Sequence, residues 1–178
     1  MLKTLAAGIG LLLAMAGFVV ALAIAAPQRD TYKLNATLQA RFEVPKPQGV
    51  PVGATGLFSG SAVEQANDRA RVTWRLTFSN LSGRAMAAHI HAGRVGRAGN
   101  VMAALCGPCR SGQRGSTMVS HAQLRVIRAG RAYVNVHTRK NAAGEIRGQM
   151  KAREVTGSGT DSTTTSTETT QPPPPPYP

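Results

Sequence analysis

Acidic and aromatic residues are scarce in this sequence. The first shortage argues against catalysis by paired carboxylates, and the second argues against specific binding of nucleic acids. Of the 178 residues, eight are Asp or Glu and 4% are aromatic. The acidic residues between 31 and 153 are scattered too widely to indicate a catalytic carboxylate pair: Glu43, Glu64, Asp68 and Glu145. Few aromatic side chains means few platforms for stacking bases, so no specific nucleic-acid partner is expected. Nucleophile-elbow, phosphate-loop and HExxH motifs are also absent, and we expect no enzyme.

Charge is missing from the stretch between Leu5 and Ala26, which is mostly Ala, Leu, Ile, Val and Gly. A run of this kind partitions into a bilayer and lacks the polar face of a soluble helix. Ala23-Ile24-Ala25 fits the small-x-small pattern of signal peptidase sites. Residues 1–26 are therefore predicted to form a hydrophobic helix, either a cleaved signal peptide or an uncleaved anchor holding the membrane through residues 4–26. Both alternatives place the rest of the chain outside the cytoplasm, secreted or membrane-anchored.

Apolar residues are nearly missing from the C-terminal end, residues 154–178. This segment is rich in Thr, Ser and Gly and finishes in a proline run. Such a composition has too little apolar surface to offset the entropy of ordering, so we expect a disordered tail. The prolines favour a stiff polyproline II rod, suited to a spacer or a wall-spanning stalk, with a WW-domain ligand as the alternative.

The remaining segment, residues 31–153, shows the period-two alternation of half-buried strands. The clearest case is 70–78, where apolar side chains alternate with Arg71, Thr73 and Arg75. A second alternating run continues from Tyr32 to Val44, where prolines stop it. Shorter strands are predicted within 56–63, 85–91, 101–105, 116–120, 131–137 and 145–150, with a helical turn over 122–129. This pattern predicts one all-β domain, a Greek-key sandwich or barrel.

Histidine is rare, with four in the chain. His89 and His91 flank Ile90, and His137 has the same relation to its valine neighbours, so all three are predicted on the outer face of their strands. Imidazoles at i and i+2 with a third from another strand suit Cu(II) or Zn(II). The alternative is that they are exposed strand residues. His121 lies in another segment.

Cysteine occurs twice, in Cys106-Gly-Pro-Cys109. The four letters resemble the thioredoxin redox motif, which depends on a following helix to lower the first thiol's pKa. A glycine-rich stretch follows here instead. Outside the cytoplasm we therefore expect a local structural disulfide, with a thiol–disulfide exchange role as the alternative.

Positive charge dominates the domain, because every Lys and Arg except Lys3 and Arg29 falls within 31–153. A surface this cationic attracts anionic polymers of the cell envelope or extracellular space. Arginine in particular favours bidentate contacts with carboxylate or phosphate. We take Arg71, Arg75, Arg94 and Arg97 as candidate polyanion-binding residues. The alternative is that biased composition supplies charge that only keeps the domain soluble.

Three motifs in order resemble the CHRD domain, first described in chordin and found in bacterial exported proteins: Ala87 to His91, Tyr133 to Thr138 and Gly144 to Gln149. The resemblance covers about residues 32–151. It implies an immunoglobulin-like or copper–zinc-superoxide-dismutase-like β barrel and no established activity. Its dismutase aspect makes His89 and His91 similar to a copper-binding His-x-His pair and His137 similar to another copper ligand. The bridging histidine and the zinc ligands lack counterparts, so full dismutase activity is not expected.

Two functions follow from these patterns. The first is a non-enzymatic exported module that binds anionic envelope polymers through a cationic face. The second is a copper- or zinc-binding domain with a redox role through His89, His91 and His137.

Overall fold

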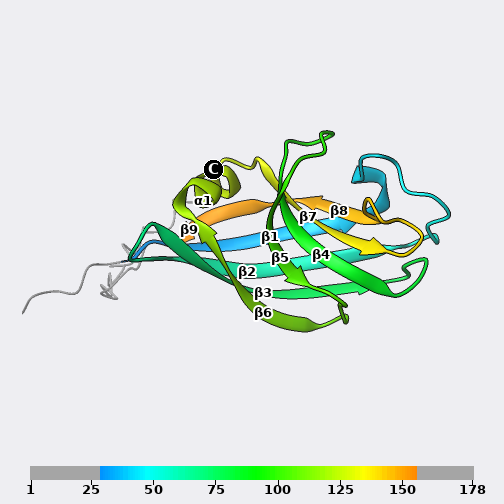
Figure 1. Cartoon of the computed structure of the whole chain (residues 1–178), viewed down its shortest axis with the longest axis horizontal. Coiled ribbons are helices and arrows are strands. Elements are labelled where there is room, and N and C mark those ends of the chain that lie inside the picture. Colours follow the sequence, from blue (N-terminus) through cyan, green and yellow to red (C-terminus); the bar gives the residue numbers. More distant parts are fainter. Residues whose placement is uncertain (1–28, 156–178) are drawn as a thin grey trace, which may run out of the picture.

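The computed structural model describes residues 29–155, and strands dominate them (Figure 1). In chain order the elements are β1 (Thr31–Gln39), η1 (Ala40–Phe42, a 3-10 turn), β2 (Thr55–Gln65), β3 (Arg69–Ser79), β4 (Ala85–Ala92), β5 (Val101–Cys106), β6 (Gln113–Ser120), α1 (His121–Arg128), β7 (Ala132–Thr138), β8 (Ile146–Gln149) and β9 (Lys151–Val155). Within these residues no helix has the length and apolarity to cross a membrane. The predicted signal segment, 1–26, and the tail beyond Val155 lie outside the described range.

The strands form one antiparallel sheet in the order β5-β4-β7-β8-β1-β2-β3-β6, with β9 pairing β1 beside β8. The two edge strands, β5 and β6, come close to each other, so the sheet curls into a nearly closed barrel (Figure 1). The prediction of an all-β domain with a barrel architecture is therefore confirmed. The barrel has two surfaces, an apolar interior and an outer face, and the functional candidates lie on the outer face.

Alternation in the sequence becomes the barrel interior. On β3, Ala70, Val72, Trp74 and Leu76 are buried, while the arginines between them are exposed. Burying a Leu or Val side chain contributes roughly 1.5–3 kcal/mol, so these rows supply the main driving force for folding. The indole of Trp74 needs a small neighbour on β6, because a Cβ at Gly115 would lie 2.5 Å from its ring.

Helix α1 covers one end of the barrel, where it contacts β9, β6 and β3. Ser120 caps its first turn by accepting a hydrogen bond from the Gln123 backbone, and the Gln123 side chain returns the contact. Leu124 and Ile127 are buried toward the strands. The predicted helical turn is thus confirmed, one residue earlier than expected at each end, and Gly130 follows it with a positive φ of 65°.

The first strand is shorter than predicted. Strand β1 stops at Gln39 rather than reaching Val44, and Phe42 is 41% exposed in the turn that follows. The chain leaves the sheet because the turn at 40–42 packs against β8, a contact that alternation alone does not reveal. At the other end, β9 continues to Val155, two residues past the predicted domain end, because five of its residues pair with β1.

Glu145 holds two loops together at the end of the barrel opposite α1. Its carboxylate is fully buried and accepts hydrogen bonds from the Ser82 backbone and hydroxyl, from Thr138 Oγ1 and from Asn141 Nδ2. Burial alone would raise the pKa of this carboxyl, but the four hydrogen bonds outweigh it and the pKa lies below its ordinary value of 4.5. The ionised form of Glu145 therefore stabilises the folded chain.

Replacing this carboxylate tests its contribution. We expect Glu145→Gln to lower the free energy of unfolding by about 1–3 kcal/mol at pH 7, because an acceptor for buried donors is lost. Since the folded-state pKa is depressed, the stabilisation is complete above the ordinary pKa of 4.5 and declines as pH falls through the lower folded value. Urea unfolding of the full-length chain between pH 3 and 8 measures both effects. Exposed Glu154→Gln is the control, and equal losses in both variants would contradict this role.

Candidate metal centre

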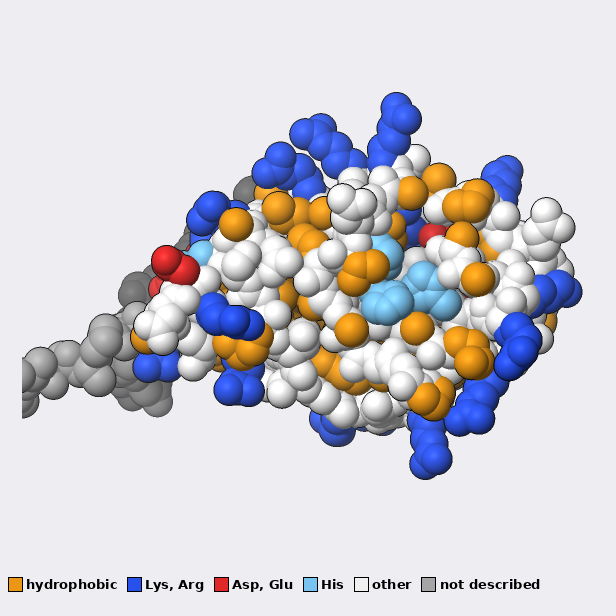
Figure 2. Space-filling model, viewed as in Figure 1, with side chains coloured by type: hydrophobic (Ala, Val, Ile, Leu, Met, Phe, Trp, Pro, Cys, Tyr) orange, Lys and Arg blue, Asp and Glu red, His pale blue; other side chains and the backbone are white. Residues whose placement is uncertain are grey.

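Three histidines meet on the outer face of β4 and β7. The register pairs Ala87 with His137 and His89 with Asn135, so the outward positions of the two strands form one surface. One nitrogen from each of His89, His91 and His137 lies within 4.8 Å of the others. Figure 2 shows a pale blue group of histidine side chains in the middle of this face, with Lys and Arg toward the rim. The predicted outer-face placement brings all three imidazoles together.

Backbone carbonyls orient two of these rings. His91 Nδ1 is 2.9 Å from the Gly99 carbonyl oxygen, and His137 Nδ1 is 2.9 Å from that of Ala142. A carbonyl can only accept, so each neutral ring carries its proton on Nδ1 and leaves the Nε2 lone pair unprotonated. This carbonyl contact is the usual support behind a metal-bound histidine.

The remaining ring nitrogens lie close together. His137 Nε2 accepts a hydrogen bond from His89 Nδ1 at 2.9 Å, whereas His91 Nε2 is buried without a hydrogen-bond partner in the described part of the chain. A buried nitrogen without a partner is costly in a folded protein. A cation bound by the three rings would satisfy it and would replace the proton shared by His89 and His137, so the donor set fits a metal ion.

Burial also keeps the three rings uncharged. Desolvation lowers the pKa of His89, His91 and His137 below the ordinary 6.5. The neighbouring rings lower the pKa of His89 further, because one imidazolium disfavours another. At neutral pH the three side chains are therefore neutral, which is the form that binds metals.

Part of this outer face is buried, so the alternative of exposed strand residues does not hold for His91. His91 is only 8% exposed, and Tyr133 and Asn135, which also point outward from β7, are almost fully buried. The loop between β4 and β5, residues 93–100, lies against His91 and Tyr133, and the Gly99 backbone is hydrogen-bonded to both. Gly99 approaches so closely that a Cβ there would lie 1.7 Å from the Ala92 carbonyl oxygen.

Arg147 on β8 fixes that loop. Its buried guanidinium donates from Nη2 to the carbonyls of Arg94 and Arg97, each at 2.9 Å. Its Cζ also lies 3.4 Å from the ring centroid of Tyr133, and the ring of His91 stacks on the same tyrosine at 4.9 Å. Arg147 is therefore linked through Tyr133 and the loop to the position of His91.

Glu43 is a buried acid that sequence reasoning did not single out. It is 2% exposed, and burial raises its pKa to about 7 although the Val44 backbone, Arg147 and Asn135 favour the charged form. Asn135 favours the charged form of His91 as well as that of Glu43. The alternating strand pattern does not mark Glu43, because this residue follows the turn at 40–42. Only the folded structure brings its carboxyl near Arg147 and Asn135.

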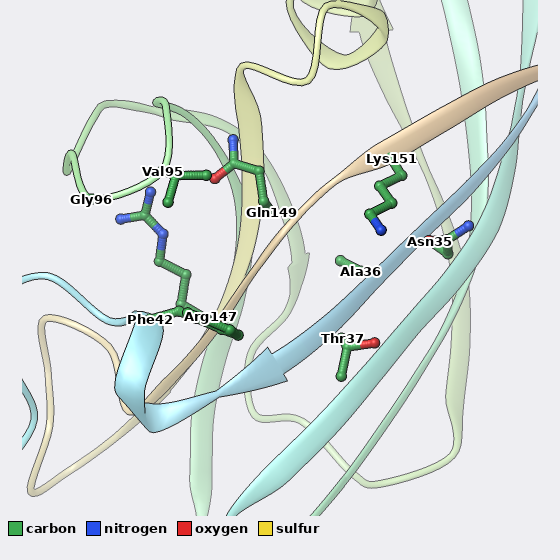
Figure 3. Close-up of a pocket in the computed structure, with 9 residues that line it drawn as sticks. All are labelled: Asn35, Ala36, Thr37, Phe42, Val95, Gly96, Arg147, Gln149 and Lys151. Carbon is green, nitrogen blue, oxygen red and sulfur yellow. The ribbon is translucent and has the colours of Figure 1, made fainter.

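Two pockets open on the outer face near these residues. One exposes the histidine cluster and has Met86, Val101 and Arg139 in its wall. The other, shown in Figure 3, lies between β1, the β8–β9 segment and the loop at Val95 and Gly96, with Phe42 and Arg147 beside it. Lys151 extends toward its interior.

The other predicted sites are distributed around the barrel. Cys106 and Cys109 lie at disulfide distance, with Sγ atoms 2.10 Å apart, and a turn rather than a helix follows them. The helix that the redox motif requires is therefore not present after it. Of the candidate arginines, Arg71 and Arg75 share the outer face of β3, whereas Arg94 and Arg97 lie in the β4–β5 loop.

These features define a class of protein: a nearly closed antiparallel β barrel with three histidines gathered on its outer face. The chain belongs to the CHRD domain family, whose model matches residues 34–150. This confirms the resemblance seen in the sequence motifs. Neither the curated proteins nor the solved structures include one that matches this chain.

The ring geometry makes a spectroscopic prediction. In the absence of metal, we expect His91 and His137 to carry their proton on Nδ1 and all three cluster histidines to titrate below pH 6.5. Since the unfolded chain takes up protons first as pH falls below 6.5, these groups destabilise the fold in acid. Side-chain nitrogen–proton correlation spectra recorded from pH 8 to pH 4 measure both properties. Protonation of His91 Nε2 at neutral pH would contradict the assignment.

Proposed function

We propose that this CHRD domain is a non-enzymatic, extracytoplasmic copper-binding domain with His89, His91 and His137 as its ligands. The observation that carries the proposal is the convergence of three neutral imidazoles within 4.8 Å, two of them oriented by carbonyls. Hydrogen bonding among histidines alone leaves His91 Nε2 without a partner. The extracytoplasmic location rests on the export segment predicted at residues 1–26.

Copper suits this donor set better than zinc. Imidazoles bind both, but among divalent first-row metals Cu(II) binds such sites most tightly. No carboxylate lines the pocket beside the cluster, and the wall includes Met86, whose soft thioether favours Cu(I). A neutral ligand set also suits the lower charge of the reduced ion. The same three residues would hold zinc as the alternative metal.

The resemblance of the sequence motifs to copper–zinc superoxide dismutase supports the ligands but not the dismutase reaction. His89 and His91 form the His-x-His pair, and His137 supplies the third nitrogen. Within residues 29–155 the metal-binding cluster has only these three members, so ligands for a second metal are absent from it. The chemistry that copper would supply here is one-electron exchange or storage of the ion.

Titration with metal tests the proposal. The full-length chain, kept in a non-ionic detergent because residues 5–26 are apolar, is titrated with Cu(II), Zn(II) and, under reducing conditions, Cu(I). We expect one copper per chain, with affinity above that for zinc. We expect copper affinity to fall as pH drops below 6.5, because protons then compete for the imidazoles. A triple His89/His91/His137→Ala variant should lose this binding.

The fourth histidine supplies the matched control. His121 lies 3.7 Å from Glu64 and 3.6 Å from Asp68, outside the cluster, so His121→Ala should retain full copper binding. Met86→Leu should weaken Cu(I) binding more than Cu(II) binding. Copper binding that survives in the triple variant, when its unfolding transition matches that of the unmodified chain, would overturn the proposal.

A further inference from the structure

A second site, separate from the histidines, lies on the outer face of β9, β1, β2, β3 and β6. The strand register builds a row of outward side chains there. Lys33 on β1 lies opposite Arg153 on one side and Ser61 on the other, and Ser61 lies opposite Thr73. Their exposed ends share a groove along the sheet.

A second row runs beside the first, two residues along each strand. Asn35 lies opposite Ser59, Ser59 opposite Arg75, and Arg75 opposite Arg114. These four residues line the same groove as the first row. Its floor is therefore made of hydroxyls, with Ser61 Oγ and Thr73 Oγ1 2.9 Å apart, and cations stand on both sides of it.

The cations form two like-charge pairs across neighbouring strands, Lys33 with Arg153 and Arg75 with Arg114. Like charges directly opposite each other destabilise a sheet. No acidic residue lines the groove, and within residues 29–155 none of these four cations has an ion-pair partner. The arrangement therefore weakens the barrel slightly, and an anionic ligand would relieve the repulsion.

The spacing of the cations and the hydroxyl groups on the floor of the groove indicate which kind of anion would bind. The inner cations of the two pairs, Lys33 and Arg75, lie two strand spacings apart across the sheet, about 10 Å, and two residues apart along it, with hydroxyls between them. A polymer seated there meets positive charge at intervals and neutral hydrogen-bonding groups in between. No exposed aromatic side chain lines the groove, so bases would have nothing to stack on.

From these observations we propose that the groove binds a linear acidic polysaccharide, with Lys33, Arg75, Arg114 and Arg153 contacting its anionic groups. Ser59, Ser61 and Thr73 would hydrogen-bond the sugar hydroxyls between them. Asn35 also lines the neighbouring pocket of Figure 3, where Lys151 adds a further cation. The binding surface for the polysaccharide therefore continues from the groove into this pocket. This site is independent of metal binding.

Removing the four cations tests whether polymer binding depends on this groove or only on the net charge of the domain. The full-length chain in non-ionic detergent is assayed by calorimetry against polygalacturonate, heparin and a single-stranded oligothymidylate, near physiological salt. We expect a Lys33/Arg75/Arg114/Arg153→Gln variant to lose about tenfold or more in affinity for the polysaccharides. Its affinity should also depend less steeply on salt concentration. Polygalacturonate and heparin distinguish carboxylate from sulfate as the anionic group.

The matched control removes the same charge elsewhere. Arg84, Arg125, Arg131 and Arg139 are exposed and lie outside the groove, so their fourfold Gln variant should lose less than about threefold. An unchanged circular dichroism spectrum and a cooperative unfolding transition would show that the fold of the groove variant is intact. Equal losses in both variants would mean that net charge alone attracts the polymer, and would overturn the site. Tighter binding of the oligothymidylate than of either polysaccharide would overturn the choice of ligand.

Discussion

The guanidinium of Arg147 determines the arrangement of the outer face between β4 and β8. Its two hydrogen bonds hold the carbonyls of the 93–100 loop, and that loop brings the Gly99 carbonyl to His91. A buried cation is costly unless its donors are used, and here backbone dipoles and the ring of Tyr133 offset part of the cost. The loop buries His91 and Tyr133 on this side of the barrel, while the histidine cluster still opens to solvent through a pocket.

Much of this barrel could be predicted from alternation alone. The strand over 70–78, the outward placement of His89, His91 and His137, and the local cysteine pair all depend on short-range patterns. What the sequence did not reveal depends on contacts between distant segments. A period-two pattern distinguishes the two faces of a strand, but it cannot show that a loop later covers the outer one.

The same limitation explains the missed residues. Glu43 lies after a turn rather than on a strand, and its raised pKa exists only because the fold buries its carboxyl, against the opposing effect of Asn135. Two of the four arginines selected from the sequence, Arg71 and Arg75, share one sheet face, whereas Arg94 and Arg97 lie in the loop held by Arg147. Cross-strand register, which the sequence does not show, decides which cations become neighbours.

The meeting of β5 and β6 has a consequence for how the molecule resists self-association. These are the two edges of the sheet, and exposed edges with unpaired backbone groups invite strands from other molecules. Here each edge shields the other without a full ladder of hydrogen bonds between them. The seam is therefore the least tightly joined line around the barrel. Thermal opening of the wall should begin there, while the β1–β2–β3 meander, which is paired along its length, stays closed.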